Sequence, residues 1–174
     1  NMPHEKVREE NKKRVIEELK NYRLLKKKRA LLRFEQEHPA RVSDSEVIEC
    51  MSLSRRVSDS IQTTGFISDK TLRIASQFRD VKDRLNQEAF AEIVRELSIV
   101  ELQLSQLEFY VGQLEKNQAE VIQKYYFEGK TWAELQQEMH LSSRTLIKRR
   151  DDGLDGLVSI YMYLDQVKKG DEVK

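Results

Sequence analysis

The most regular hydrophobic pattern in the chain runs from residue 74 to residue 114. Apolar residues recur there at steps of three and four, the spacing of one helix face. From residue 97 onward the two steps alternate strictly, as in a coiled-coil seam. The seam consists of Ile74, Phe78, Val81, Leu85, Ala89, Ile93, Leu97, Val100, Leu104, Leu107, Val111 and Leu114. Such a helix would be roughly 60 Å long, so its apolar face needs a partner. The first helix folded back and the same helix of a second subunit both fit.

Two further helices are predicted before this seam. Residues 4–37 form one long, highly charged helix that ends at His38-Pro39. Its thin apolar stripe consists of Val15, Leu19, Tyr22, Leu25 and Leu32. Ser43 and Glu46 then form a capping box that opens a second helix. Its inward residues are Val47, Met51, Val57 and Ile61, with Cys50 buried or half-buried in its middle. Residues 63–65 end it, and Ser68 caps the seam helix.

The stretch 121–157 predicts three short helices around one apolar core. Gly129 ends the first helix by supplying a left-handed residue past its last turn. Thr131 and Glu134 form a capping box that opens the second, and Ser142 caps the third. The inward residues are Val121, Ile122, Tyr125, Trp132, Leu135, Met139, Leu141, Leu146, Leu154 and Leu157. A short capped helix, a tight turn and a longer helix with cations in its opening turns is the pattern of a helix-turn-helix.

The same stretch resembles region 4 of bacterial sigma factors (sigma-70 type). The family's E-G-x-[ST] turn is present as Glu128-Gly129-Lys130-Thr131, and its L-x-[IL]-S turn corresponds to Met139-His140-Leu141-Ser142. Within this group the sequence is most similar to phage and prophage late-transcription regulators of the ArpU/RinA type. Those proteins join a helical N-terminal half to a sigma-like C-terminal module, and the likeness does not extend to the first 65 residues.

Landmarks later in the family pattern also match, and three positions depart from it. Leu146, Arg149 and Gly153 follow the turn serine by four, seven and eleven residues, as in the family. His140 stands where the family usually has a helix-ending glycine. Gly153 and Gly156 interrupt the third helix more often than the family pattern leads us to expect.

The helix-turn-helix pattern and the resemblance together imply a set of DNA-contacting residues at the start of the third helix. Arg144, Thr145, Ile147 and Lys148 are expected to face bases, with Ser143 at the edge of this surface. Arg149 and Arg150 are expected to meet phosphates, unless Arg149 turns inward to brace the turn. The partners implied are double-stranded DNA and RNA polymerase. The apolar edge of the seam from Leu97 to Leu114 adds the expectation of a homodimer.

Composition favours a helical protein and offers little enzyme chemistry. Of 174 residues 35% are charged, and there are only 6 Gly and 2 Pro. A single cysteine excludes an internal disulfide framework and suits a reducing cytoplasm. No apolar run approaches the roughly 20 residues of a membrane span. His4, His38 and His140 lie far apart in sequence, so we predict no metal site, no cofactor and no catalytic residue.

Charge is distributed unevenly along the chain. The net charge is +1, but residues 1–33 hold 12 Lys and Arg against 5 Glu. The strongest run, Lys26-Lys27-Lys28-Arg29, is either a solvated helix face or a second phosphate-contacting surface. Residues 117–174 hold 9 Lys and Arg against 10 Asp and Glu, so DNA binding would rest on a focused patch.

The sequence therefore predicts an all-α protein in three parts. Residues 1–65 form an N-terminal helical region, 66–115 a long coiled-coil-like helix, and 116–174 a helix-turn-helix DNA-binding domain. We expect a non-enzymatic, sequence-specific regulator of phage or prophage transcription. Two alternatives stay open: a DNA-packaging assembly protein similar to a phage small terminase subunit, and a protein that binds RNA polymerase with little DNA affinity. A dimer suits a regulator and a ring suits packaging.

Overall fold

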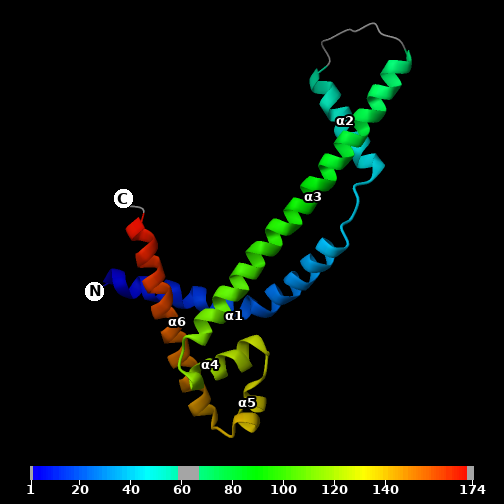
Figure 1. The fold of residues 1–174 in the computed structure, drawn as a ribbon. Helices are drawn as coiled ribbons and strands as arrows, with labels where there is room; N and C mark the ends of the chain where they lie inside the picture. Colours follow the sequence, from blue (N-terminus) through cyan, green and yellow to red (C-terminus); the bar gives the residue numbers. More distant parts are fainter. Residues whose placement is uncertain (1, 59–66, 172–174) are drawn as a thin grey trace. The chain divides into compact units, whose positions relative to one another are not determined.

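The computed structural model describes the backbone of residues 2–58 and 67–171, and the side chains of residues 5–53 and 71–168. Within these ranges every regular element is helical, which confirms the all-α prediction. The elements are α1 (Met2–Glu37), α2 (Asp44–Ser58), α3 (Ile67–Gly112), α4 (Lys116–Ile122), the π-helical turn η1 (Gln123–Phe127), α5 (Trp132–Met139) and α6 (Ser143–Asp171) (Figure 1).

The chain forms two compact units. The larger combines Asn1–Arg29 with Ile99–Lys174, and the smaller is Ala30–Ser98. Helices α1 and α3 each run from one unit into the other. This grouping places an early and a late stretch of the chain in one unit, whereas the sequence-based division at residues 65 and 115 follows chain order and stays a prediction.

In the smaller unit the predicted capping box opens α2. The Ser43 hydroxyl accepts a hydrogen bond from the Glu46 amide at 3.3 Å, and the Glu46 carboxylate accepts one from the Ser43 amide at 2.8 Å. Val47 is fully buried, as predicted. An ion pair of 2.7 Å between Lys82 and Asp44 ties the start of α2 to α3.

Part of the sequence prediction for this region falls outside the described residues. Ile61, residues 63–65 and the side chains of Val57 and Ser68 are among them. The structure describes α3 from Ile67, so Ser68 lies inside the helix and the prediction that it caps the helix is wrong.

Between Val100 and Val111 the apolar seam of α3 is covered within the chain. In the larger unit the buried members of α1 and α3 are Val15, Leu19, Tyr22, Val100, Leu104, Leu107 and Val111. The Tyr22 hydroxyl donates to the Glu108 carboxylate at 2.6 Å, joining α1 to α3. The rings of Tyr110 and Tyr161 meet edge to face at 5.6 Å, joining α3 to α6. Between Val100 and Val111 the seam's partner is therefore the first helix folded back, together with α6, so this stretch no longer argues for a second subunit.

Glycines in α6 let it pack closely on its neighbours without breaking the helix. Helix α6 is continuous from Ser143 to Asp171, through both Gly153 and Gly156. A β-carbon at Gly153 would lie 2.8 Å from Ile122 Cδ1, and one at Gly156 would lie 2.7 Å from Leu114 Cδ2. These glycines therefore permit the close approach of α6 to α4 and to the segment after α3.

We predict that Leu104→Lys destabilises the isolated chain by at least about 3 kcal/mol, because it places a charge in a closed apolar core. Leu104 is 1% exposed, whereas Leu102 on the same helix is 58% exposed, so Leu102→Lys is the matched control. Chemical denaturation followed by circular dichroism measures both. Equal losses for the two variants would contradict the burial of the seam within one chain.

Candidate nucleic-acid interface

We call residues 116–171, from α4 to the end of α6, the C-terminal module. It begins with a helix that ends in a π-helical turn. Helix α4 is followed directly by η1, and the Glu128 amide donates to the Gln123 carbonyl at 3.0 Å. Gly129 follows with φ +74°, the left-handed conformation predicted for it. The π-helical turn itself was not predicted from the sequence. Such turns are rare and occur frequently at functional sites.

The aromatic run of η1 contacts two different helices. Tyr125 stacks on Trp132 of α5 with ring centroids 4.4 Å apart. Phe127 stacks on Tyr22 of α1 at 3.8 Å. Tyr125 and Trp132 pack against the buried core, which confirms the prediction that they are core residues. The turn η1 therefore fixes α5 and α1 relative to the core of the larger unit.

Caps define both ends of α5 and the start of α6. The Thr131 hydroxyl accepts from the Glu134 amide at 3.3 Å, and the Glu134 carboxylate accepts from the Thr131 amide at 2.7 Å, as predicted. His140 has φ 54° and ψ 37°, so it adopts the left-handed conformation that a glycine provides easily. The Ser142 hydroxyl then accepts from the Thr145 amide at 3.2 Å and caps α6, also as predicted.

The core beneath this connection contains the predicted residues. Val121, Leu135 and Leu146 form a fully buried cluster. Tyr125, Trp132, Met139 and Leu141 pack against it. Ile122, Leu154 and Leu157 are also buried. Helices α4, α5 and the first half of α6 are therefore held together by one apolar core (Figure 1).

The start of α6 exposes two cations beside an apolar residue. Arg144, Ile147 and Lys148 are all exposed, while Leu146 between them is fully buried. Arg144 and Lys148 are four residues apart and share one face of the helix. Neither forms an ion pair with any residue whose side chain the structure describes. These three of the predicted DNA-contacting residues are brought together on one surface.

The remaining predicted contact residues are less exposed. Ser143, Thr145 and Arg149 are half-buried. The Thr145 hydroxyl lies 2.9 Å from the Ser142 hydroxyl, so it takes part in the helix cap. Thr145 is therefore held at the edge of the exposed surface by the cap.

Arg150 is engaged by groups on its own module. Its guanidinium forms an ion pair of 2.7 Å with Asp151 and lies 5.3 Å above the ring of Trp132. Asp155, one turn further along α6, pairs with Arg8 of α1 at 3.4 Å. Because Asp151 and Asp155 lie on the face of α6 that carries Lys148, the positive surface ends after about two helical turns.

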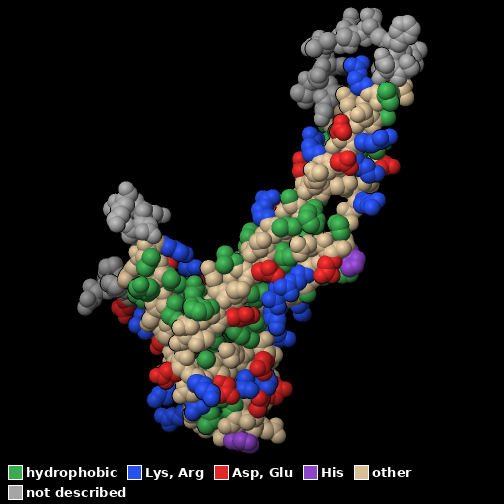
Figure 2. Space-filling view, in the orientation of Figure 1, with side chains coloured by type: hydrophobic (Ala, Val, Ile, Leu, Met, Phe, Trp, Pro, Cys, Tyr) green, Lys and Arg blue, Asp and Glu red, His purple; other side chains and the backbone are tan. Residues whose placement is uncertain are grey.

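A four-residue ion-pair cluster fastens η1 to α5. Lys124 and Lys130 both donate to the Glu138 carboxylate, and Lys130 also pairs with Glu128 at 3.0 Å. The hydrogen bonds from Lys124 and Lys130 lower the pKa of Glu138 from 4.5 to about 2. Figure 2 shows cations and carboxylates interspersed over this part of the surface. Since two of its lysines are neutralised here, the module offers few unpaired cations outside α6.

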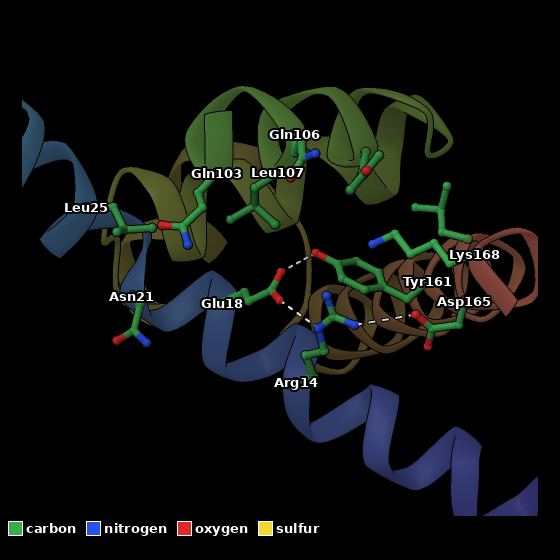
Figure 3. Close-up of a pocket in the computed structure, with 12 residues that line it drawn as sticks. Arg14, Glu18, Asn21, Leu25, Gln103, Gln106, Leu107, Tyr161, Asp165 and Lys168 are labelled. Atoms are coloured by element: carbon green, nitrogen blue, oxygen red, sulfur yellow. Dashed lines mark hydrogen bonds and ion pairs between the residues drawn. The ribbon is translucent and has the colours of Figure 1, made fainter. Parts of the chain in front are cut away.

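A second polar cluster joins α1 to the far half of α6 (Figure 3). Tyr161 donates to Glu18, and Arg14 bridges Glu18 at 3.0 Å and Asp165 at 3.6 Å. Burial, together with the hydrogen bond to Glu18, raises the pKa of Tyr161. These groups line a pocket of about 320 Å³ that Leu107 of α3 also borders. Because its charged and phenolic groups largely bond one another, we interpret the cluster as a brace that positions α6.

Comparisons with known proteins and a search for other sites add nothing to this geometry. No family model matches the chain, and no curated protein or solved structure is significantly similar to it. In the part of the chain that the structure describes, no cluster of three or more His, Cys, Asp or Glu could hold a metal ion. None of the helices searched there combines the length and the apolar character needed to cross a membrane.

We predict that the ion-pair cluster makes the stability of the module sensitive to acid. The lowered pKa of Glu138 means that its stabilising effect is full above the ordinary carboxyl pKa of 4.5 and is lost as pH falls towards about 2. Glu138→Gln should therefore flatten the fall in melting temperature over this pH range. Asp152→Asn is the control, because Asp152 is exposed and forms no ion pair among the described residues. Parallel curves for wild type and Glu138→Gln would contradict the cluster's role.

Proposed function

We propose that this protein is a sequence-specific DNA-binding regulator of transcription that reads DNA with the first two turns of α6. In this proposal α5, the turn at His140 and α6 act as a helix-turn-helix. The second helix of such a motif lies in the major groove, and residues near its amino end contact base edges. Arg144, Ile147 and Lys148 occupy that position and are exposed.

The observation that carries the proposal is the chemistry of this exposed surface. An arginine donates in a bidentate manner to guanine, and an apolar side chain contacts the thymine methyl group. Arg144 and Ile147 could make these two contacts, while Leu146 anchors the same turn in the core. Ser143 and Thr145 would add polar contacts at the edge, and Arg149 would meet a phosphate.

Electrostatics favour specific over general binding. Residues 117–174 hold 9 basic against 10 acidic residues, so the module has little attraction for DNA as a whole. Arg150 is paired with Asp151 and supplies less free charge than the sequence suggested. Of the α6 cations that form no ion pair among the described residues, Arg149 is half-buried and Lys168 lies far along the helix. The two exposed ones near the amino end, Arg144 and Lys148, lie where base contacts are expected.

The resemblance to sigma region 4 narrows the proposed role. His140 adopts the left-handed conformation that the family's glycine would take, which removes one apparent departure from the pattern. The implied genes are those of a phage or prophage, regulated in the cytoplasm beside RNA polymerase. The packaging alternative, similar to a small terminase subunit, differs in assembly rather than in how DNA is held.

We predict that Arg144→Ala removes the preference for the natural site while leaving the fold intact. Genomic fragments retained by the purified protein define that site, and binding isotherms on the site and on a scrambled duplex measure the preference. A lost bidentate contact is worth about 1–3 kcal/mol, so the preference should fall by about 5- to 150-fold. The melting temperature should not change, because the side chain is exposed.

Lys116→Ala is the matched control, since Lys116 is an exposed cation of the same module on α4. It should leave the preference unchanged. An equal loss of affinity on both duplexes for Arg144→Ala would contradict a role in reading bases.

We further predict that the full chain is a homodimer in solution, because helix-turn-helix regulators commonly bind two half-sites on one face of the duplex. Sedimentation equilibrium of the unmodified chain at micromolar concentration measures this. A ring of many copies would favour the packaging alternative, and a monomer that persists on DNA would rule out the dimer.

A further inference from the structure

An open groove of about 910 Å³ lies between α1 and the C-terminal module. One wall is a single face of α1, and the other is formed by η1, the turn before α5 and the middle of α6. The charged residues that line the groove are Lys12, Lys20, Arg23, Lys130, Arg150 and Asp151. Five of these six are cations, which makes the groove far more basic than the chain as a whole.

The uncompensated charge in the groove belongs to α1. Lys130 is already paired with Glu128 and Glu138, and Arg150 is paired with Asp151. Lys12, Lys20 and Arg23, by contrast, form no ion pair among the residues whose side chains are described. The Arg23 guanidinium lies against Gly129, where a β-carbon would come within 2.3 Å of Nη1.

The spacing of these cations suits an extended anion better than a small one. A small anion is held by donors that converge on one point. Lys12 and Arg23 are eleven residues apart and so are separated by about 16 Å along α1. That length corresponds to the axial rise of about five nucleotides of one DNA strand.

We propose that this groove binds the sugar-phosphate backbone of the duplex that α6 reads. The inference rests on the proposed function and adds a second, sequence-independent contact to it. Asp151 also lines the groove and lies three residues after Lys148 on the same face of α6, so the groove borders the exposed surface at the start of α6 and one duplex can reach both. Phosphate contacts from α1 would fix the register of α6 in the major groove without reading bases.

The cations of the groove are not those of the basic run from Lys26 to Arg29 that stands out in the sequence. None of the residues from Lys26 to Arg29 lines the groove. Lys26 instead lies 5.8 Å from the centroid of the Tyr22 ring, which stacks on Phe127. The cations that matter are therefore spread along α1 at helical spacing instead of clustered in sequence. Deleting α1 cannot test them, because Val15 and Leu19 belong to the core.

The test is the salt dependence of duplex binding by the full chain, with the triple variant Lys12→Gln, Lys20→Gln and Arg23→Gln. Each phosphate contact contributes about 0.9 to the slope of log Kobs against log salt concentration. The slope should therefore fall by about 2.7 on both the preferred and a scrambled duplex, and the preferred site should stay the same.

Two further variants complete the test. Lys26→Gln, Lys27→Gln and Lys28→Gln remove the same charge from the same helix outside the groove and should lower the slope by less than about 1. If the first triple variant melts early, Lys12→Gln with Lys20→Gln keeps Arg23 against Gly129 and should lower the slope by about 1.8.

The outcomes separate this inference from the proposed function. An unchanged slope for the groove variants would overturn the inference alone and would fit a groove that binds an acidic protein segment. An equal fall in slope for the control triple variant would also overturn the inference alone. Failure of the wild-type chain to bind any duplex would overturn the proposed function and this inference together.

Discussion

Helix α6 buries two stretches of its length against two different sets of helices, and the rest of the larger unit is built around this arrangement. Leu146 lies in one core with Val121 and Leu135. Tyr161, about four turns later, is buried between other elements, where it donates to Glu18 of α1 and meets Tyr110 of α3. Since the helix is continuous and is held at two buried stretches, the direction in which its exposed first turns point is fixed. A reading surface on such a rigid element can hold its geometry without help from DNA.

Local signals allowed much of the candidate site to be predicted from sequence. The capping box at Thr131 and Glu134 depends on residues three apart, and so does the cap at Ser142. The left-handed residue at Gly129 follows from its position past the last turn of a helix. The buried positions of α4, α5 and α6 follow from their spacing. Each of these features is decided within about one helical turn, so the order of residues is enough to reveal it.

Features decided by contacts across the chain could not be predicted in this way. The periodicity of α3 showed that the seam needed a partner but not which helix would supply it. The pairing of Lys124 with Glu138 crosses fourteen residues and starts from the π-helical turn that contains Lys124. From the sequence, Gly153 was expected to interrupt the third helix. In the structure Ile122 packs against it, and this close contact explains why a residue without a side chain fits there. Likewise, the ion pair with Asp151 changes what Arg150 can contribute, and nothing in the spacing of basic residues indicates that.

Cleavage of bound DNA from a tethered reagent tests the central claim most directly, namely that the start of α6 enters the major groove. The single cysteine, Cys50, can be replaced by serine and a new cysteine placed at Ile147, which is 38% exposed. A chelated iron attached there should cut the preferred duplex at a few adjacent positions facing one major groove. The same reagent attached to a cysteine in place of Leu102, which is 58% exposed on α3, should leave those positions of the duplex uncut. Cuts from residue 102 with none from residue 147 would contradict the account.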